Sequence, residues 1–226
     1  MKTLFIYLFI IISAMTSCQD KKDFSQKNNN KNNIMNEKFD FKLYKKYQSS
    51  NGTLKLENGN TILSMSPPSP NEIGIQTELL PKPSFLYYYK EFFPNGNIKK
   101  KELKFSETVK LMKSEHYAEN GTIEKTVDED KTYRKIKYKD VLNFLDSKGY
   151  IDLRTGEGRL NEDGTNKYDV DYDPTIPAWK ILITQGKRLT EKELFDIMNS
   201  SGGEPNPWKP IVYQMNGETG KVEELK

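Results

Sequence analysis

The sequence predicts an α+β fold in which antiparallel β-hairpins form most of the chain and two helices lie in its C-terminal half. Asn-Gly pairs separate β-favouring aromatic segments, and a tight hairpin turn needs residues that accept positive φ. Two later segments carry apolar residues at helical spacing. With 226 residues, 35% of them hydrophobic, 13 Tyr and 11 Phe, the chain has a thin core that aromatic side chains must largely build.

Composition excludes several classes of site. Lys and Arg number 35 against 32 Asp and Glu, so there is no chain-wide field for binding a polyanion, and no nucleic-acid partner is expected. The single Cys and single His exclude a disulfide framework, a Cys/His zinc site and a Cys-His dyad within one chain. We therefore expect no metal and no cofactor.

The N-terminus carries the strongest signal. Met1-Lys2 precedes an apolar run over residues 4–14, which is too short to span a bilayer and has the length of a secretory h-region. The segment ends in Ala14-Met15-Thr16-Ser17-Cys18, which resembles a bacterial lipobox, although Met15 departs from the usual Leu, Val or Ile. The resemblance implies a signal peptide over residues 1–17, lipidation of Cys18 and a bilayer as partner through the acyl chains.

Residues 18–37 are rich in Asn and Lys and predict a disordered tether, because such a segment buries no hydrophobic face. Asp does not follow Cys18 directly, which argues against inner-membrane retention. The charged cluster over residues 20–23 resembles the surface-export signal of Bacteroidetes-type lipoproteins, with a plain spacer as the alternative. The expected location is the outer membrane, on its periplasmic face or at the cell surface.

Residues 38–135 are expected to form a region of antiparallel hairpins. The alternation of Phe39, Phe41 and Leu43 predicts a half-buried strand, and the prolines after Met65 predict a loop. The remaining expected features are hairpin turns at Asn51-Gly52 and Asn58-Gly59, strands over 85–93 and 98–105, and a turn at Pro94-Asn95-Gly96-Asn97.

Two of these hairpins form an internal repeat. Asn95-Gly96-x-Ile98 recurs as Asn120-Gly121-x-Ile123, and Asn51-Gly52 is a candidate earlier copy. The segment over 92–99 resembles the core of MORN-variant, "antitoxin component" repeats of bacterial lipoproteins. We expect both glycines at positive φ and both isoleucines in equivalent inward positions.

Residues 136–226 are expected to form an α+β region. Its predicted elements are a helix over 139–148, a short strand over 150–153, a polar loop over 161–177, a strand over 178–184, a helix over 190–199, and strands over 208–215 and 221–225. The end of the chain, from Tyr213 through Thr219-Gly220-Lys221-Val222, resembles the last hairpin of PepSY-type modules; the helix over 190–199 departs from that pattern.

Three motifs invite a chemical interpretation, and each has a simpler one. The acidic run over 169–173 fails the EF-hand pattern, since Pro174 occupies the Gly position and Lys180 the Glu position, and predicts a solvated loop. The sequence identifies no nucleophile that His116 could activate, so we expect His116 to be a surface residue. The lysines over 99–101 predict a solvated strand face, because acidic residues interleave with them.

The expected function is that of a non-catalytic, envelope-anchored binding lipoprotein with a protein partner. The most specific version is an immunity protein that neutralises a toxin, which the repeat resemblance implies. One alternative is a PepSY-like regulator or inhibitor of an envelope peptidase. The other is a hydrolase that uses carboxylates, since a carboxylate pair leaves no local signature in sequence. No catalytic residue is nominated.

Overall fold

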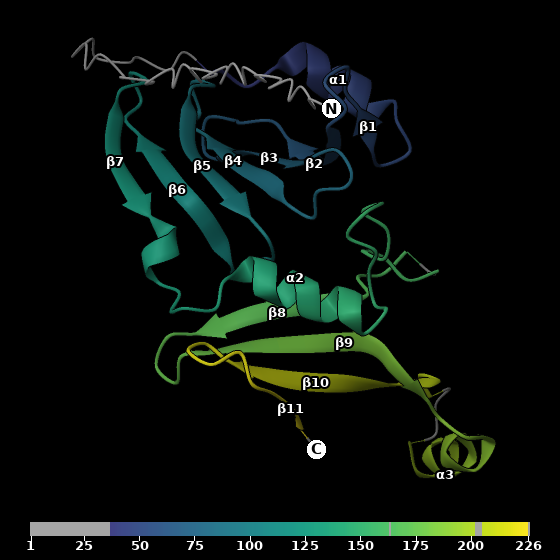
Figure 1. The fold of residues 1–226 in the computed structure, drawn as a ribbon. Coiled ribbons are helices and arrows are strands. Elements are labelled where there is room, and N and C mark those ends of the chain that lie inside the picture. Colours follow the sequence, from purple (N-terminus) through teal and green to yellow (C-terminus); the bar gives the residue numbers. More distant parts are fainter. Residues whose placement is uncertain (1–36, 163, 202–204, 226) are drawn as a thin grey trace, which may run out of the picture. The chain divides into compact units, whose positions relative to one another are not determined.

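A computed structural model describes residues 37–162, 164–201 and 205–225 (Figure 1). The predicted signal peptide, Cys18 and almost all of the predicted tether lie outside the described residues. The α+β class is confirmed: the described residues form two antiparallel sheets and three α-helices. No helix in these described ranges is long and apolar enough to cross a membrane.

The first sheet is a seven-stranded meander in which each strand pairs with its neighbours in the chain. A short 3₁₀ turn, η1 (Glu129–Lys131), follows its last strand. The seven strands are β1 (Leu54–Lys55), β2 (Thr61–Ser66), β3 (Gly74–Leu79), β4 (Tyr87–Phe92), β5 (Ile98–Lys104), β6 (Lys110–Tyr117) and β7 (Ile123–Asp128).

The strand predicted from Phe39, Phe41 and Leu43 is wrong, because the segment forms helix α1 (Phe41–Gln48). The Asp40 carboxylate caps this helix by accepting hydrogen bonds from the backbone N–H groups of Lys42 and Leu43, at 2.8 and 2.9 Å. Phe39 is buried ahead of the helix, whereas Phe41 is exposed. The cap therefore outweighs a three-residue alternation of apolar side chains.

The two repeated hairpin turns have the predicted backbone. Gly96 and Gly121 both have φ of 84°. In each turn the Asn side chain accepts the N–H two residues later, Asn97 N to Asn95 Oδ1 at 2.9 Å and Thr122 N to Asn120 Oδ1 at 3.0 Å. These bonds hold the tight turn that positive φ at glycine permits.

A third turn has the same construction at Asn58-Gly59, not at Asn51-Gly52. Gly59 has φ of 86°, and Asn60 N donates to Asn58 Oδ1 at 3.0 Å. Gly52 also has positive φ, but it lies between α1 and β1 and closes no hairpin. The expected hairpin at Asn51-Gly52 is therefore wrong.

The predicted equivalence of the two isoleucines is half right. Ile98 pairs with Phe92 and Ile123 pairs with Tyr117, so their places after the turn match. Ile98 is 0% exposed, however, while Ile123 is 42% exposed. The reason is packing: Ile98 belongs to a core cluster with Phe39 and Phe92, whereas Ile123 lies on the edge strand β7 outside that cluster.

The second sheet has the order β11-β10-β9-β8, and helix α2 packs on it (Figure 1). Val141, Leu142 and Leu145 of α2 are buried in one cluster with Trp179 and Tyr213 of the sheet. The elements are α2 (Tyr138–Ser147), β8 (Tyr168–Asp173), β9 (Ala178–Arg188), α3 (Glu191–Ser201), β10 (Trp208–Asn216) and β11 (Val222–Leu225).

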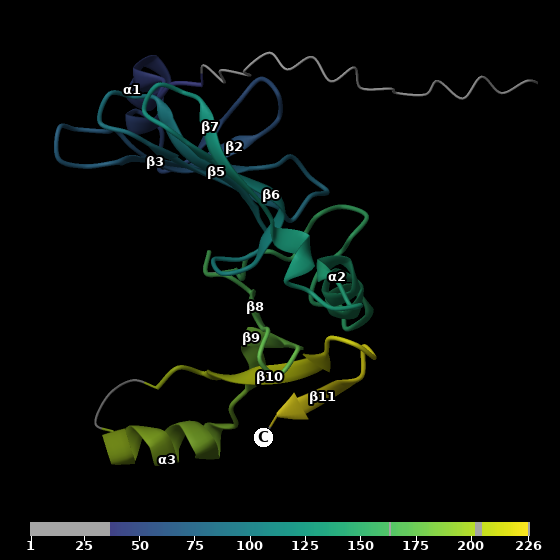
Figure 2. The ribbon, with the colours of Figure 1, turned by 90° about the vertical axis from the view of Figure 1, so that its left-hand side faces the viewer.

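Helix α3 forms where the sequence places it, beyond the strands β9 and β10 that it joins (Figure 2). Thr190 and Glu193 form the predicted capping box, with Thr190 N donating to Glu193 Oε2 at 2.8 Å and Glu193 N donating to Thr190 Oγ1 at 3.3 Å. Its apolar side chains are exposed, with Phe195 at 59% and Met198 at 47%.

Three other expectations are wrong. The loop expected over 161–177 contains strand β8, and the strand expected over 150–153 is reduced to one bridge between Asp152 and Glu157. The loop expected from Met65 onward begins two residues later, and β3 follows it unpredicted. In β8 the side chains of Tyr168, Val170 and Tyr172 are buried while the intervening aspartates are exposed, so the acidic run is the outer face of a strand.

Candidate functional site

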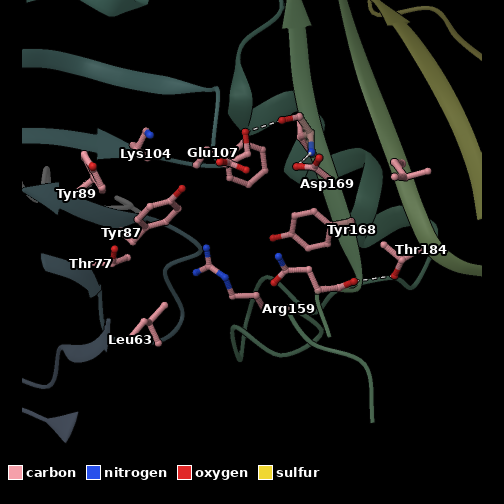
Figure 3. Close-up of a pocket in the computed structure, with 15 residues that line it drawn as sticks. Leu63, Thr77, Tyr87, Tyr89, Lys104, Glu107, Arg159, Tyr168, Asp169 and Thr184 are labelled. Atoms are coloured by element: carbon pink, nitrogen blue, oxygen red, sulfur yellow. Dashed lines mark hydrogen bonds between the residues drawn. The ribbon is translucent and has the colours of Figure 1, made fainter. Parts of the chain in front are cut away.

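A pocket of about 680 Å³ lies where the first sheet meets strands β8 and β9 (Figure 3). The two sheets touch beside it: Ser106 Oγ donates to the Val170 carbonyl at 2.5 Å, and Thr108 Oγ1 donates to Asp171 Oδ1 at 2.8 Å. The walls come from three parts of the chain. They are strands β2 to β5 with the turn after β5, the loop containing Arg159 and Asn166, and strands β8 and β9.

Strand alternation places the tyrosines of the first wall. Tyr87 and Tyr89 are two residues apart on β4 and therefore share one face of the sheet. Thr77 of β3 pairs with Tyr89, and Lys104 of β5 pairs with Tyr87, which brings both to the same face. The Lys104 ammonium lies 4.8 Å from the centre of the Tyr89 ring. Burial raises the pKa of Tyr87 to about 12, so its hydroxyl stays neutral and can donate a hydrogen bond.

Glu102 explains why Lys104 is held in place. Its side chain is only 1% exposed and has the ammonium groups of Lys110 at 2.7 Å, Lys100 at 3.8 Å and Lys104 at 3.9 Å. The 2.7 Å contact is an ion pair without hydrogen-bond geometry, since Glu102 Oε1 accepts no hydrogen bond. Burial, with the neighbouring lysines, lowers the pKa of Lys104 despite Glu102. Lys104 is thus already engaged by a carboxylate and an aromatic ring.

Arg159 reaches the pocket from a loop in which two glycines allow the backbone to pack closely against neighbouring segments of the chain. Gly158 has φ of 93°, and a Cβ there would collide with the Tyr150 carbonyl. A Cβ at Gly156 would lie 2.7 Å from Pro83 Cα. The Arg159 backbone carbonyl accepts the Lys167 N–H at 2.9 Å. The guanidinium is therefore carried on a backbone that is fixed on both sides.

The Arg159 guanidinium has no carboxylate partner among the described residues. Its carbon lies 5.5 Å from the centre of the Tyr87 ring, and its buried Nη1 has no hydrogen-bond acceptor. Burial lowers its pKa, but an arginine remains charged at neutral pH. Figure 3 shows the guanidinium pointing into the space between Tyr87, Thr77 and Leu63.

Tyr168 forms the facing wall. Its ring lies 6.2 Å from that of Phe105, and its buried hydroxyl has no hydrogen-bond partner. Burial raises its pKa to about 12. Arg159 Nη1 and Tyr168 Oη are two of four buried side-chain polar atoms without a partner in the described part of the chain. Native proteins leave few such atoms unpaired, so two that line the same pocket need an explanation.

Two carboxylates complete the charge distribution of the pocket. Glu107 and Asp169 lie on the side away from Arg159, with Tyr87 and Tyr168 between them (Figure 3). Neither forms an ion pair with a cation in the described ranges, and Asp169 Oδ1 accepts only the N–H of the next residue, at 2.9 Å. The pocket therefore has the Arg159 guanidinium at one end and the carboxylates of Glu107 and Asp169 at the other, where the Lys104 ammonium also lies.

The residues that the sequence singled out lie mostly elsewhere. His116 is half-buried in β6 between Lys100 and Lys125, outside the pocket and inside the sheet, not at a surface edge. The lysines over 99–101 are not a freely solvated face, since all three form ion pairs with Glu91 or Glu37. Of the acidic run only Asp169 and its neighbour Val170 line the pocket.

Sequence reasoning missed Arg159 and the pocket itself. Arg159 follows a Gly-Glu-Gly turn that reads as an ordinary loop, and nothing local shows that it meets β4 and β8. The described residues also hold no group of three or more His, Cys, Asp or Glu placed for a metal ion.

No family model, no curated protein and no solved structure matches this chain. The functional argument therefore rests on the pocket and on the N-terminal sequence.

Proposed function

We propose that this chain is a non-catalytic binding protein of the bacterial cell envelope, attached through lipid on Cys18, and that the pocket around Arg159 holds its ligand. One observation carries the proposal: Arg159 Nη1 and Tyr168 Oη are buried in the pocket walls with no hydrogen-bond partner among the residues that the structure describes. Leaving a buried polar group unpaired costs about 1–3 kcal/mol, and more for a charged one. A ligand that supplies the missing acceptor recovers that cost.

The shape and lining of the pocket agree with this role. A volume of about 680 Å³ falls in the usual range for small-molecule sites. Aromatic rings from Tyr87, Phe105 and Tyr168 offer apolar surface, and the polar side chains that line most of the pocket can fix the orientation of a ligand. The ligand is a small molecule or an exposed side chain or terminus of a partner protein. The second case corresponds to the immunity protein that the hairpin repeats imply.

A carboxylate-dependent hydrolase is the second candidate, because Glu107 and Asp169 both line the pocket. In that function one carboxyl group would act as the acid and the other as the base or nucleophile. Binding is preferred because the unsatisfied groups at Arg159 and Tyr168 call for a ligand whether or not chemistry follows. Release of a product from a bound compound would favour the hydrolase.

Blocking the pocket tests the proposal. Leu63 lines the pocket and is 37% exposed, so Leu63→Trp places a large ring at its mouth. Ile73→Trp is the matched control, since Ile73 is 36% exposed and does not line this pocket. We expect compounds from an envelope metabolite library to raise the thermal midpoint of the wild type and of Ile73→Trp, but not of Leu63→Trp. Equal stabilisation of both variants, or no stabilisation of the wild type, would contradict the proposal.

A further inference from the structure

We infer that the ligand of this pocket is a small zwitterion of the amino-acid or short-peptide class, with its carboxylate against Arg159 and its amino group toward Glu107 and Asp169. The inference rests on the proposed function and adds the chemistry of the ligand. Three features of the pocket carry it: a guanidinium and two carboxylates that form no ion pair within the described part of the chain, and aromatic walls between them.

The positive end selects a planar anion. A guanidinium presents its N–H groups as a fork that matches the two oxygens of a carboxylate. Within the described ranges Arg159 Nη1 has no acceptor, and the Tyr168 hydroxyl, neutral because its pKa is about 12, is a second donor without a hydrogen-bond partner in the same pocket.

The negative end argues against a phosphate. A phosphate dianion at Arg159 would share the pocket with the carboxylates of Glu107 and Asp169, and like charges repel. A singly charged carboxylate meets less repulsion than a dianion.

A positively charged group on the ligand would be attracted by the carboxylates of Glu107 and Asp169. Neither Glu107 nor Asp169 forms an ion pair within the described residues, although both line the pocket. An ammonium group suits this position, because its three N–H donors can bind carboxylate oxygens that have no ion-pair partner within the described residues. The tyrosine rings between the two ends leave room for a side chain, since the volume of about 680 Å³ exceeds that of glycine.

Four probes separate the two ends of the ligand without any mutation. Glycine, the dipeptide Gly-Phe, N-acetyl-Gly-Phe and Gly-Phe amide are each titrated into the full chain at millimolar concentrations, with NMR shifts of the arginine Nε–Hε and tyrosine signals as readout. We expect Gly-Phe to give saturable shifts at Arg159 and Tyr168. Amidation removes the negative charge of the carboxylate, and acetylation removes the positive charge of the amino group. Each change should weaken binding roughly tenfold, because each removes one charge-assisted contact.

Paired variants test the residues. Arg159→Gln should weaken Gly-Phe binding roughly tenfold, while Arg154→Gln, which removes an exposed arginine of the same loop, should leave it unchanged. Glu107→Gln with Asp169→Asn should abolish the difference between Gly-Phe and its N-acetyl derivative. If Arg159→Gln fails to fold, the amide probe on the wild type still decides the role of the carboxylate.

The outcomes distinguish this inference from the proposed function. No saturable shift with glycine or Gly-Phe, or equal binding of the dipeptide and its amide, overturns the zwitterion assignment. Library compounds that still require an open pocket in the Leu63→Trp comparison would then leave the proposed binding function standing. If no library compound depends on the open pocket, the proposed function fails as well.

Discussion

Lys90→Met should strongly destabilise the first sheet, because Lys90 holds two carboxylates inside it. Its ammonium lies 2.7 Å from Glu37 Oε1 and 3.1 Å from Glu78 Oε2, and its side chain is 11% exposed. Glu78 also accepts hydrogen bonds from Asn60 at 2.6 Å and from Gln76 at 3.1 Å. Burial pushes the pKa of Glu78 upward, but the hydrogen bond from Asn60 and the attraction of Lys90 together hold it below its ordinary value.

The magnitude follows from what remains after the substitution. Removing one partner of a buried ion pair costs about 3–5 kcal/mol, because the other charge stays buried. Glu78, 8% exposed, keeps its two amide donors, and Glu37, 24% exposed, keeps Lys101 at 3.3 Å. The cost should therefore fall near the lower limit, about 3 kcal/mol. Lys99→Met is the matched control: Lys99 is 39% exposed and 3.6 Å from Glu91, so its loss should cost less than about 1 kcal/mol.

Urea denaturation at two pH values tests both the size and the origin of the effect. Because the folded-state pKa values of Glu37 and Glu78 are lowered, their contribution is present above about pH 4.5 and is lost as the pH falls through those values. The Lys90→Met deficit should shrink in acid, and adding Glu78→Gln should recover about 2 kcal/mol at neutral pH. A deficit below about 0.5 kcal/mol at neutral pH, or one that stays constant in acid, would refute the reasoning.

Three further predictions concern other parts of the chain. Gly96→Val and Gly121→Val should each cost about 1 kcal/mol or more in chemical denaturation, since both glycines have φ of 84°; wild-type stability in either variant would contradict the shared turn. Asn97→Val should also be destabilising, because Asn97 Nδ2 donates to the Glu119 carbonyl at 2.6 Å and ties the two turns together; no change in the urea midpoint would show that this bond contributes nothing. Stability should fall between about pH 10 and pH 12, as Tyr87 and Tyr168, whose folded pKa values are about 12, lose the advantage of staying neutral; tyrosinate absorbance that appears fully near pH 10 in the folded protein would contradict their burial.

The last prediction concerns the membrane anchor. Cys18→Ala should abolish palmitate labelling and detergent-phase partitioning, because the chain contains no other Cys to receive lipid. Equal labelling of the wild type and the variant would exclude lipidation of Cys18.

Sequence reasoning succeeded where local signals were strong. The helix expected over 139–148 is α2 at Tyr138–Ser147, and the capping box at Thr190 starts α3. The turns at Gly96 and Gly121 follow from an Asn side chain and a glycine that act within four residues. Such interactions need no knowledge of the rest of the fold.

It failed where tertiary position decided the outcome. Ile98 and Ile123 occupy equivalent places after equivalent turns, yet only the strand in the middle of the sheet buries its isoleucine. The acidic run hides an alternation of Tyr168, Val170 and Tyr172, which an emphasis on charge obscured. Arg159 could not be nominated, because its significance lies in its contact with the Tyr87 ring and in a pocket that Tyr168 of another strand also lines.

The most direct measurement of the central claim follows the Nε–Hε NMR signal of Arg159 while small molecules extracted from the cell envelope are titrated into the full chain. A ligand in the pocket should shift this signal saturably, together with the ring signals of Tyr87 and Tyr168, and leave the exposed Arg154 signal in place. Binding that shifts residues elsewhere while Arg159 and Tyr168 stay unmoved would contradict the account.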